Sequence, residues 1–220
     1  MLIMYSRSEE NYLKAIYHLK QRASVGVSTN AIAEAMETKP SSVTDMLRKL
    51  SDKKLVNYVK YKGASLTDKG IKAALGIVRK HRIWEVFLLE KLDFNWDEVH
   101  EIAEQLEHIK SEELINRLDK FLDFPDYDPH GDPIPDKNGN IKSAEKKLLS
   151  ELKKGNQGVL VGVKETSPEF LQFLDKRAIA IGTPVKVLGK EFFDGSMVIQ
   201  VKSEQFFISK KIAENLYIQI

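Results

Sequence analysis

The sequence of 220 residues contains no cysteine. This absence excludes disulfides, thiolate zinc sites, iron–sulfur clusters and thiol nucleophiles, so nitrogen and oxygen atoms must hold any bound metal. The sequence also lacks any apolar run near the roughly 18 residues that a membrane span needs. Because residues 1–10 lack the cationic start and the long apolar stretch of a signal peptide, we expect a cytoplasmic protein with no membrane partner.

The net charge is only +2, but the charges are distributed unevenly. Residues 1–75 carry a net charge of +6, residues 76–140 carry −8 and residues 141–220 carry +4. A basic first segment favours a polyanionic partner, and an acidic segment that also holds histidines favours a cation. Solvated helix faces of opposite sign would give the same distribution, so the motifs in each segment must decide between the two interpretations.

The first segment has the pattern of a winged helix-turn-helix. Apolar residues at helical spacing predict a helix over 8–21, and the cap residues Ser28-Thr29-Asn30 begin a short second helix. Three residues then lead to Pro40, which suits the first turn of a third helix. Beyond it, residues 56–67 are β-rich around a Lys62-Gly63 turn, which indicates a hairpin that would form the wing.

The third helix has a polar face opposite its apolar stripe. Hydroxyl groups and basic side chains bond to base edges and phosphates, and a helix N-terminus favours phosphate. Seven basic and two acidic residues lie between Lys39 and Lys62, so the helix and the wing share a positive field. A solvated helix with scattered lysines is the simpler alternative. We expect double-stranded DNA as the partner, facing Ser41, Ser42, Thr44, Asp45, Arg48 and Lys49 on the helix and Lys60 and Lys62 on the wing.

The acidic middle segment holds candidate metal ligands. Asn95 and Glu98 have the spacing of a capping box, which predicts a helix over 97–109. Four side chains of this helix fall within one polar arc, namely His100, Glu104, Glu107 and His108. The preceding helix, expected over about 70–90, adds a pair at i, i+4 spacing, His81 and Glu85. Clustered carboxylates are costly without a cation, which favours a divalent metal over a merely solvated face.

The rest of the chain predicts a change from helices to strands. Ser111 caps a helix with an apolar stripe to Leu122, and residues 124–140 hold four of the seven prolines, which predicts a boundary loop. A turn role is expected for His130 in that loop. Strands are expected at 158–163, 184–188, 197–201 and 205–208, and helices at 168–176 and 210–216. The fold class is mainly α with a small β domain, either a barrel or an open sandwich.

Several stretches together resemble the diphtheria-toxin-repressor family of metal-dependent transcriptional regulators, in its manganese-type branch with a C-terminal domain. The stretches are EENYLKAIY, KPSSVTDMLRKL, LTDKG, RKHRIWEVFL, EVHEIAEQLEH, SEELINRLDKFLDFP and PHGDPIP. The resemblance implies a homodimer whose chain has a winged helix-turn-helix over 1–70 and a helical metal-binding and dimerisation domain over 71–140. It also implies an SH3-like domain, similar to ferrous-transport protein A, over 141–220.

The resemblance also implies two metal sites and a set of DNA contacts. The primary site would use Asn11, Glu104, Glu107 and His108. The ancillary site would use His81, Glu85 and His100, completed from the SH3-like domain by Glu169 or Glu165. DNA contacts would come from Lys39, Ser41, Ser42, Thr44, Asp45 and Arg48.

The primary set departs from the family pattern in a way that bears on the metal. Iron-sensing relatives carry sulfur ligands at the positions of Asn11 and Glu104, and manganese-sensing relatives carry aspartate at the position of Asn11. Glu104 therefore favours a harder ion, and an oxygen-rich site with one imidazole suits Mn(II) first and Fe(II) second, rather than zinc. Asn11 lowers the negative charge of the site by one and should weaken its affinity.

These expectations define a regulator, most simply a repressor of metal-homeostasis genes, and not an enzyme. A metal that joins Asn11 to the ligands of the middle segment would fix the recognition helices of a dimer about 34 Å apart, one turn of DNA. A histidine ligand must be neutral, so the metal response should be lost below about pH 6. Two alternatives stay open: an enzyme with a carboxylate-bridged dimetal centre, for which no second Glu-x-x-His helix exists, and a winged-helix regulator that senses an organic ligand.

Overall fold

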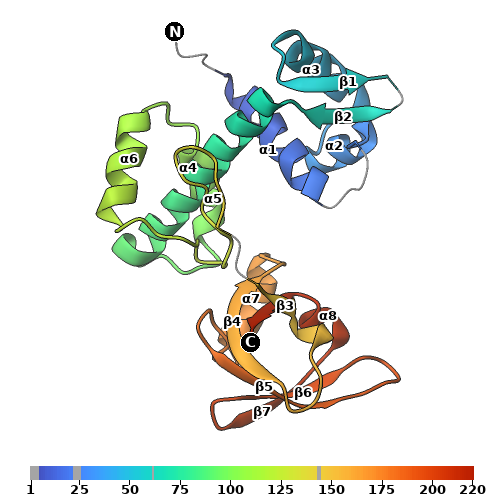
Figure 1. Cartoon of the computed structure of the whole chain (residues 1–220), viewed down its shortest axis with the longest axis vertical. Helices are drawn as coiled ribbons and strands as arrows, with labels where there is room; N and C mark the ends of the chain where they lie inside the picture. The colour runs from blue at the N-terminus through green and yellow to red at the C-terminus, as the bar shows by residue number, and fades with distance from the viewer. Residues whose placement is uncertain (1–4, 22–25, 61, 143–144) are drawn as a thin grey trace. The chain divides into compact units, whose positions relative to one another are not determined.

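The computed structural model (Figure 1) divides the chain into two compact units, each described by itself. Unit 1 comprises residues 1–81, 104–117 and 135–141, and unit 2 comprises residues 82–103, 118–134 and 142–220. The structure describes residues 5–21, 26–60, 62–142 and 145–220. Within these residues, no helix combines the length and the apolar character that a membrane crossing would require.

Unit 1 begins with the three helices that the sequence predicts, α1 (Arg7–Gln21), α2 (Thr29–Ala35) and α3 (Pro40–Asp52). The Ser28 hydroxyl accepts a hydrogen bond from the Ala31 amide, which satisfies one free N–H at the start of α2. The apolar stripes of the helices meet in one core, in which Leu13, Ile32 and Leu47 are fully buried. Four residues, 36–39, join α2 to α3, one more than the sequence predicts, and the two helices form the helix-turn-helix.

The wing is a two-stranded antiparallel hairpin of β1 (Val56–Val59) and β2 (Gly63–Leu66). Gly63 has φ +92°, and a Cβ at this position would overlap the Val27 carbonyl, so a glycine is needed here. Ala64 and Val27 exchange two backbone hydrogen bonds of 2.8 Å, which tie the hairpin to the segment before α2.

Three further helices follow the wing. The Thr67 hydroxyl accepts a hydrogen bond from the Gly70 amide and begins α4 (Asp68–Leu92). The Ser111 hydroxyl likewise begins α6 (Glu112–Phe121) by accepting from the Leu114 amide. Between them, α5 covers only Val99–Leu106.

The prediction of one helix over 97–109 is wrong at both ends. The Asn95 amide does donate to the Glu98 carboxylate at 2.9 Å, but residues 96–98 form a turn and the helix starts at Val99. At the other end, Glu107 and His108 lie in a turn after Leu106. Glu107 is nevertheless fully buried, and its carboxylate contacts Lys14 together with that of Glu104.

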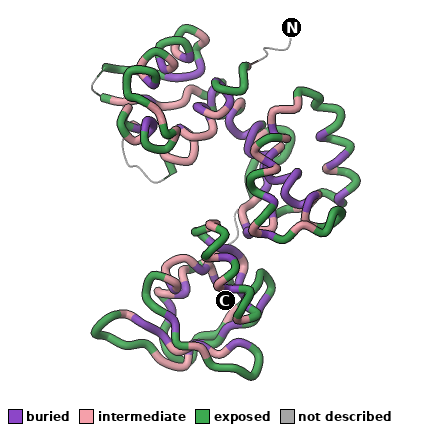
Figure 2. The backbone as a smooth tube through the Cα atoms, turned by 180° about the vertical axis from the view of Figure 1, so that it is seen from behind, coloured by how far each residue is buried: buried purple, intermediate pink, exposed green. Residues whose placement is uncertain are grey.

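Unit 2 contains a six-stranded antiparallel sheet in the order β3-β8-β4-β5-β6-β7. The strands are β3 (Lys147–Leu148), β4 (Gln157–Val163), β5 (Pro184–Lys190), β6 (Met197–Val201), β7 (Glu204–Ile208) and β8 (Leu216–Gln219). One 3₁₀ turn and two helices join them, η1 (Leu149–Glu151), α7 (Pro168–Asp175) and α8 (Lys210–Ala213). Burial alternates along β6, because one face of the strand packs on the core. Figure 2 colours the backbone by burial and shows buried segments in both units.

Two parts of this sheet depart from the sequence prediction. The predicted helix over 210–216 is wrong at its C-terminal end, because α8 ends at Ala213 and Leu216–Gln219 form the central strand β8. The short strand β3 is missed, since two residues carry no periodicity. Both strands are defined by pairing with distant segments, Lys147 with Ile218 and Val163 with Leu216, which no local pattern contains.

The predicted loop over 124–140 has no helix or strand, but its first half is packed against β4. The Val163 amide donates to the His130 carbonyl at 2.9 Å. Gly131 has φ +82°, and a Cβ at this position would overlap the Val161 carbonyl oxygen. This close approach places His130 inside unit 2, where it is 3 % exposed.

Candidate metal centre and nucleic-acid interface

The four residues predicted for the primary metal site all belong to unit 1. Asn11 lies on α1, Glu104 lies on α5, and Glu107 and His108 follow in the turn. The Oε1 atom of Glu107 lies 3.7 Å from Nε2 of His108. The structure thus brings a carboxylate and an imidazole together at the end of α5.

Three polar atoms of this set are buried without a hydrogen-bond partner, Oδ1 of Asn11, Oε1 of Glu107 and Nε2 of His108. Buried polar atoms nearly always have partners, so three such atoms within one predicted ligand set need an explanation. Each of them is a lone-pair donor of the kind that a hard divalent ion accepts. The donor set therefore fits a divalent metal on the chemistry of this structure alone.

The other atoms of the same side chains are engaged by protein groups. Nδ1 of His108 lies 2.6 Å from Oε2 of Glu10, and this contact fixes the ring with Nε2 facing away from Glu10. Nδ1 of His81 lies 2.7 Å from Oε2 of Glu107. Such outer contacts orient metal-binding imidazoles and carboxylates. Glu10, which directly precedes Asn11, was not predicted to belong to this site. Only the structure shows that it is buried, with 6 % of its surface exposed.

A lysine also reaches these carboxylates. Nζ of Lys14 lies 2.5 Å from Oε1 of Glu104 and 2.7 Å from Oε2 of Glu107. Burial raises the pKa of Glu107, but the His81 and Lys14 contacts outweigh it and hold that pKa below its ordinary value. Glu107 is therefore an ionised carboxylate inside unit 1. Lys14 was not among the residues predicted for this site.

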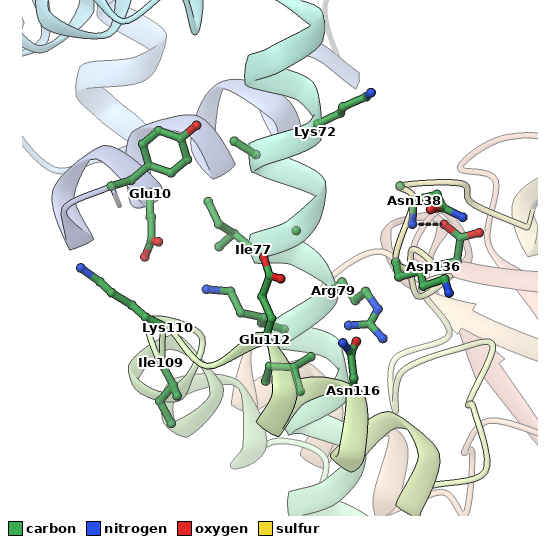
Figure 3. A pocket seen from close by; sticks show the side chains of 17 residues that line it. Glu10, Lys72, Ile77, Arg79, Ile109, Lys110, Glu112, Asn116, Asp136 and Asn138 are labelled. Atoms are coloured by element: carbon green, nitrogen blue, oxygen red, sulfur yellow. Dashed lines mark hydrogen bonds between the residues drawn. The ribbon is translucent and has the colours of Figure 1, made fainter. Parts of the chain in front are cut away.

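A cavity of about 610 Å³ lies beside Glu10. Figure 3 shows Glu10, Lys110 and Glu112 around it, from α1, the loop before α6 and α6 itself. Its lining includes five basic side chains and three acidic ones, and burial lowers the pKa of Lys80 in its wall. Apolar side chains such as Ile77, Ile109 and Ile115 lie beside these charges, so the lining is mixed.

Unit 2 holds a second cluster of metal-binding side chains, which is fully buried. Ligand atoms of Glu85, Asp128 and His130 lie within 4.8 Å of one another. Nε2 of His130 lies 2.8 Å from the Trp96 carbonyl oxygen, and Nδ1 of the same ring lies 3.7 Å from Oε1 of Glu85. His100 adds a further imidazole atom, Nδ1, at 3.4 Å from the same carboxylate oxygen.

The charges of this cluster shift two pKa values. Burial, together with the negative charges of Glu85 and Asp132, raises the pKa of Asp128 to about 7. The positive charge of Arg82 lowers this pKa but only partly offsets the rise. Burial lowers the pKa of His130, but the hydrogen bond and charge of Glu85 raise it to about 9. The Asp128 carboxylate also accepts a hydrogen bond from the His130 amide at 2.9 Å, so His130 has the turn role expected from the sequence. The sequence did not indicate that its side chain also lies beside two carboxylates.

The predicted ancillary set is divided between the units. His81 belongs to unit 1, while Glu85 and His100 belong to unit 2 together with the two candidates of the C-terminal domain. Glu165 accepts a hydrogen bond from the Ser167 amide, and Glu169 lies in the first turn of α7. Neither of these two belongs to a three-residue ligand cluster in the part of the chain that the structure describes. Their role as ligands stays a prediction.

The residues predicted to contact DNA lie on α3 and the wing. Lys39 caps α3, and most of the predicted contacts are exposed, namely Lys39, Ser41, Ser42, Asp45, Arg48, Lys60 and Lys62. Thr44 is half-buried, and its hydroxyl donates to the Pro40 carbonyl. A groove of about 320 Å³ lies between helix and wing, lined by Arg48, Ser51, Asp52, Tyr58 and Lys60. Lys49 is exposed as expected, and its ammonium also pairs with Glu9 of α1 at 3.1 Å.

Comparisons with known proteins match the chain along most of its length. Residues 4–64 match the iron dependent repressor N-terminal DNA binding domain. Residues 67–136 match the iron dependent repressor metal binding and dimerisation domain, and residues 147–220 match the FeoA domain. The order of these matches agrees with the winged helix, helical segment and antiparallel sheet described above.

Individual relatives agree with these matches. A manganese-dependent transcriptional repressor in complex with manganese aligns with a TM-score of 0.86 at 32 % identity, over 96 % of this chain and 98 % of that one. The HTH-type transcriptional regulator MntR of Oceanobacillus iheyensis is 35 % identical over 55 % of this chain and 81 % of its own.

A probable metal transport system membrane protein of Chlamydia trachomatis is 37 % identical over 60 % of this chain, but the match spans only 30 % of that protein. Its additional length has no counterpart in the alignment, so its transport activity has no bearing on this chain. The MntR of Oceanobacillus iheyensis and the manganese-dependent repressor, in contrast, are matched over 81 % and 98 % of their length. The chain belongs to the iron-dependent repressor family, the diphtheria-toxin-repressor family of metal-dependent, DNA-binding transcriptional regulators.

Proposed function

We propose that this protein represses metal-homeostasis genes in the cytoplasm in response to Mn(II), with Fe(II) as the alternative ion. The observation that carries the proposal is the group of three buried, unpartnered atoms on Asn11, Glu107 and His108. The similar repressor in complex with manganese, and a family whose domains are described as iron dependent, agree with a hard or borderline ion.

The ligands that we propose for the primary site are Asn11, Glu104, Glu107 and His108. Two carboxylates, one amide oxygen and one imidazole give an oxygen-rich set that suits Mn(II) better than tetrahedral zinc. Glu10 supports the set from outside through its contact with Nδ1 of His108. A bound ion would supply a charge that attracts Asn11 and the carboxylates at once.

Unit 1 joins this site directly to the helix-turn-helix. Asn11 lies on α1, whose buried residues Leu13 and Ile16 pack in the same core as Leu47 of α3. The other three ligands lie at the end of α5. Holding α1 against this turn therefore restricts the orientation of α3. This restriction matters because a two-fold dimer needs its two recognition helices about 34 Å apart to enter successive major grooves. Metal and DNA then increase each other's affinity by the same factor.

The ancillary metal site that we propose is centred on Glu85 in unit 2. His100, Asp128 and His130 surround this carboxylate. Arg82 contacts Oδ2 of Asp128 at 3.3 Å and balances part of its charge. The role proposed for this site is to stabilise unit 2.

The test is the affinity for DNA as a function of free metal. A duplex is selected from a random pool with the full chain in Mn(II), and its affinity is measured at one fixed salt concentration with Mn(II), Fe(II), Zn(II) or EDTA. We expect EDTA to weaken binding at least about tenfold, since allosteric coupling usually amounts to about five- to 150-fold. Equal affinity in EDTA and Mn(II) would contradict the proposal.

A variant pair ties the response to the primary site. Glu107→Gln removes a ligand charge in a side chain of the same size and should abolish the difference between Mn(II) and EDTA. Glu101→Gln, on the exposed side of α5, is the matched control and should keep the full difference. Circular dichroism verifies that both variants are folded. A full metal response in Glu107→Gln would favour a regulator that senses a different ligand.

A further inference from the structure

The strongest unexplained feature beside the proposed metal site is the Lys14 side chain. Its ammonium lies 2.5 Å from Glu104 and 2.7 Å from Glu107, two of the proposed ligands. The side chain is only 12 % exposed, and Glu107 is fully buried. A buried ammonium between two carboxylates occupies a position that a bridging cation would otherwise take.

The position of Lys14 on α1 makes the contact possible. Lys14 follows Asn11 by three residues and Glu10 by four, so all three lie on one face of the helix. That face meets the turn after α5, where Glu10 contacts His108 while Lys14 contacts Glu107. The ammonium is therefore a covalently tethered positive charge on the same helix as the amide ligand.

The atoms that the ammonium engages differ from those that are unpartnered. Lys14 contacts Oε2 of Glu107, whereas Oε1 of Glu107 is buried without a hydrogen bond, as are Oδ1 of Asn11 and Nε2 of His108. Lys14 and His81 thus both contact Oε2 of Glu107, while Oε1 accepts no hydrogen bond. Lys14 also holds Oε1 of Glu104, which would otherwise be available as the second charged ligand.

We propose that Lys14 is an internal cation that competes with the metal: it holds Glu104 and Glu107 in the metal-free protein, and metal binding displaces it from them. This inference rests on the proposed metal-dependent function and specifies what determines the metal concentration at which the protein responds. Without metal, the ammonium already links α1 to the end of α5. Metal binding then exchanges one cation for another, so the protein responds only when the metal concentration is high enough to displace the tethered charge.

The test measures Mn(II) affinity directly, from the free Mn(II) signal in electron paramagnetic resonance during titration of the full chain. Lys14→Gln removes the competing charge and should bind Mn(II) at least about tenfold more tightly than the unmodified protein. Lys14→Arg keeps the charge and should stay close to the unmodified affinity. Lys14→Met has the same expected gain as Lys14→Gln and replaces it if that variant does not fold.

A matched control is available on the other side of unit 1. Nζ of Lys53 lies 2.6 Å from the buried carboxylate of Glu9, which is not among the proposed ligands. Lys53→Gln removes a lysine from a buried carboxylate in the same way and should leave Mn(II) affinity within about twofold. An equal gain in Lys53→Gln and Lys14→Gln would overturn the inference, because the effect would then be a general one of net charge.

A second readout is the melting temperature with and without Mn(II). Lys14→Gln leaves two carboxylates facing each other, so it should melt below the unmodified protein in EDTA and gain more from saturating Mn(II). If both proteins bind Mn(II) with the same affinity, the competition is disproved while the proposed function stands. If neither binds Mn(II), both proposals are overturned. Binding by Lys14→Gln alone would overturn the displacement, because the unmodified protein would then never exchange Lys14 for the metal.

Discussion

At the scale of single residues, the candidate site is defined by what its atoms contact. The sequence placed Asn11, Glu107 and His108 among the ligands, and the structure leaves one buried atom of each without a hydrogen bond. The partners of their other atoms, Glu10 and Lys14, were not predicted. A signal existed for both, since Lys14 follows Asn11 by three residues and Glu10 by four, but charged residues on a surface helix are too common for spacing alone to single them out.

Gly131 is a residue whose backbone positions the buried cluster of unit 2. Its φ of +82° and its contact with the Val161 carbonyl leave no room for a Cβ. We expect Gly131→Ala to destabilise unit 2 by at least about 3 kcal/mol, which combines the strain of a left-handed φ with the steric overlap. Thermal unfolding followed by tryptophan fluorescence measures the loss, because Trp96 stacks on His130 with ring centroids 6.4 Å apart.

Gly155→Ala is the control for this prediction. Gly155 also has a positive φ, +89°, but a Cβ there would meet no atom within 4 Å. Its replacement should cost only the strain of the backbone, about 1 kcal/mol. Equal losses in the two variants would show that Gly131 is needed for its backbone conformation alone and that the approach to Val161 is unimportant for packing.

At the scale of elements, the structure shows how helices far apart in sequence are tied together. Glu9 of α1 accepts a hydrogen bond from Lys53 at 2.6 Å and pairs with Lys49 at 3.1 Å, both at the C-terminal end of α3. Cations are favourable at the C-terminal end of a helix, so Lys49 and Lys53 complement the dipole of α3. The Glu9 carboxylate pairs with these same two lysines. This contact adds a polar link to the apolar core between α1 and α3.

The link between α1 and α3 predicts a pH dependence. Burial raises the pKa of Glu9, but Lys53, the Ser6 amide and Lys49 outweigh it and lower that pKa to about 2, against 4.5 ordinarily. A depressed carboxyl pKa stabilises the folded state fully above about pH 4.5, and this contribution is lost as the pH falls to about 2. Glu9→Gln should therefore be less stable than the unmodified protein at about pH 7, and the difference should shrink between about pH 4.5 and 2.

Urea unfolding followed by circular dichroism at several pH values measures this difference. The control is Glu113→Gln, because Glu113 is an exposed carboxylate that pairs with Arg117 on the surface of α6. Exposed pairs contribute little, so the Glu113→Gln curve should follow the unmodified protein at every pH. A gap for Glu9→Gln that is as large at about pH 2 as at about pH 7 would refute the assignment.

At the scale of the whole molecule, the uneven distribution of charge separates two kinds of chemistry. The basic first third carries the exposed side chains of α3 and the wing, and the acidic middle third carries three of the four proposed primary ligands. These opposite charges nearly cancel, so the net charge of the whole chain is only +2. Phosphate contacts release counterions, so the DNA affinity of such a protein must fall as the salt concentration rises.

The salt dependence of DNA binding provides the corresponding prediction. In a plot of log affinity against log salt, Arg48→Gln and Lys60→Gln should each reduce the slope by about one if each side chain neutralises one phosphate. Lys186→Gln, an exposed lysine on β5 in unit 2, should leave the slope unchanged. The affinities are measured in saturating Mn(II) on one duplex. An unchanged slope in Arg48→Gln would place the phosphate contacts elsewhere.

The sequence by itself determined the elements that depend on local chemistry. The Ser28 cap, Pro40 and the β-rich wing defined the helix-turn-helix, because caps, proline and periodicity act over only a few residues. It also identified the metal-ligand types and the repressor family. The tertiary structure decided what depends on distant segments: the pairing of β8, the burial of His130 beside Glu85, the end of α5 at Leu106 and the Lys14 ammonium between two carboxylates. Such contacts are set by packing between segments up to 93 residues apart, and no local pattern encodes them.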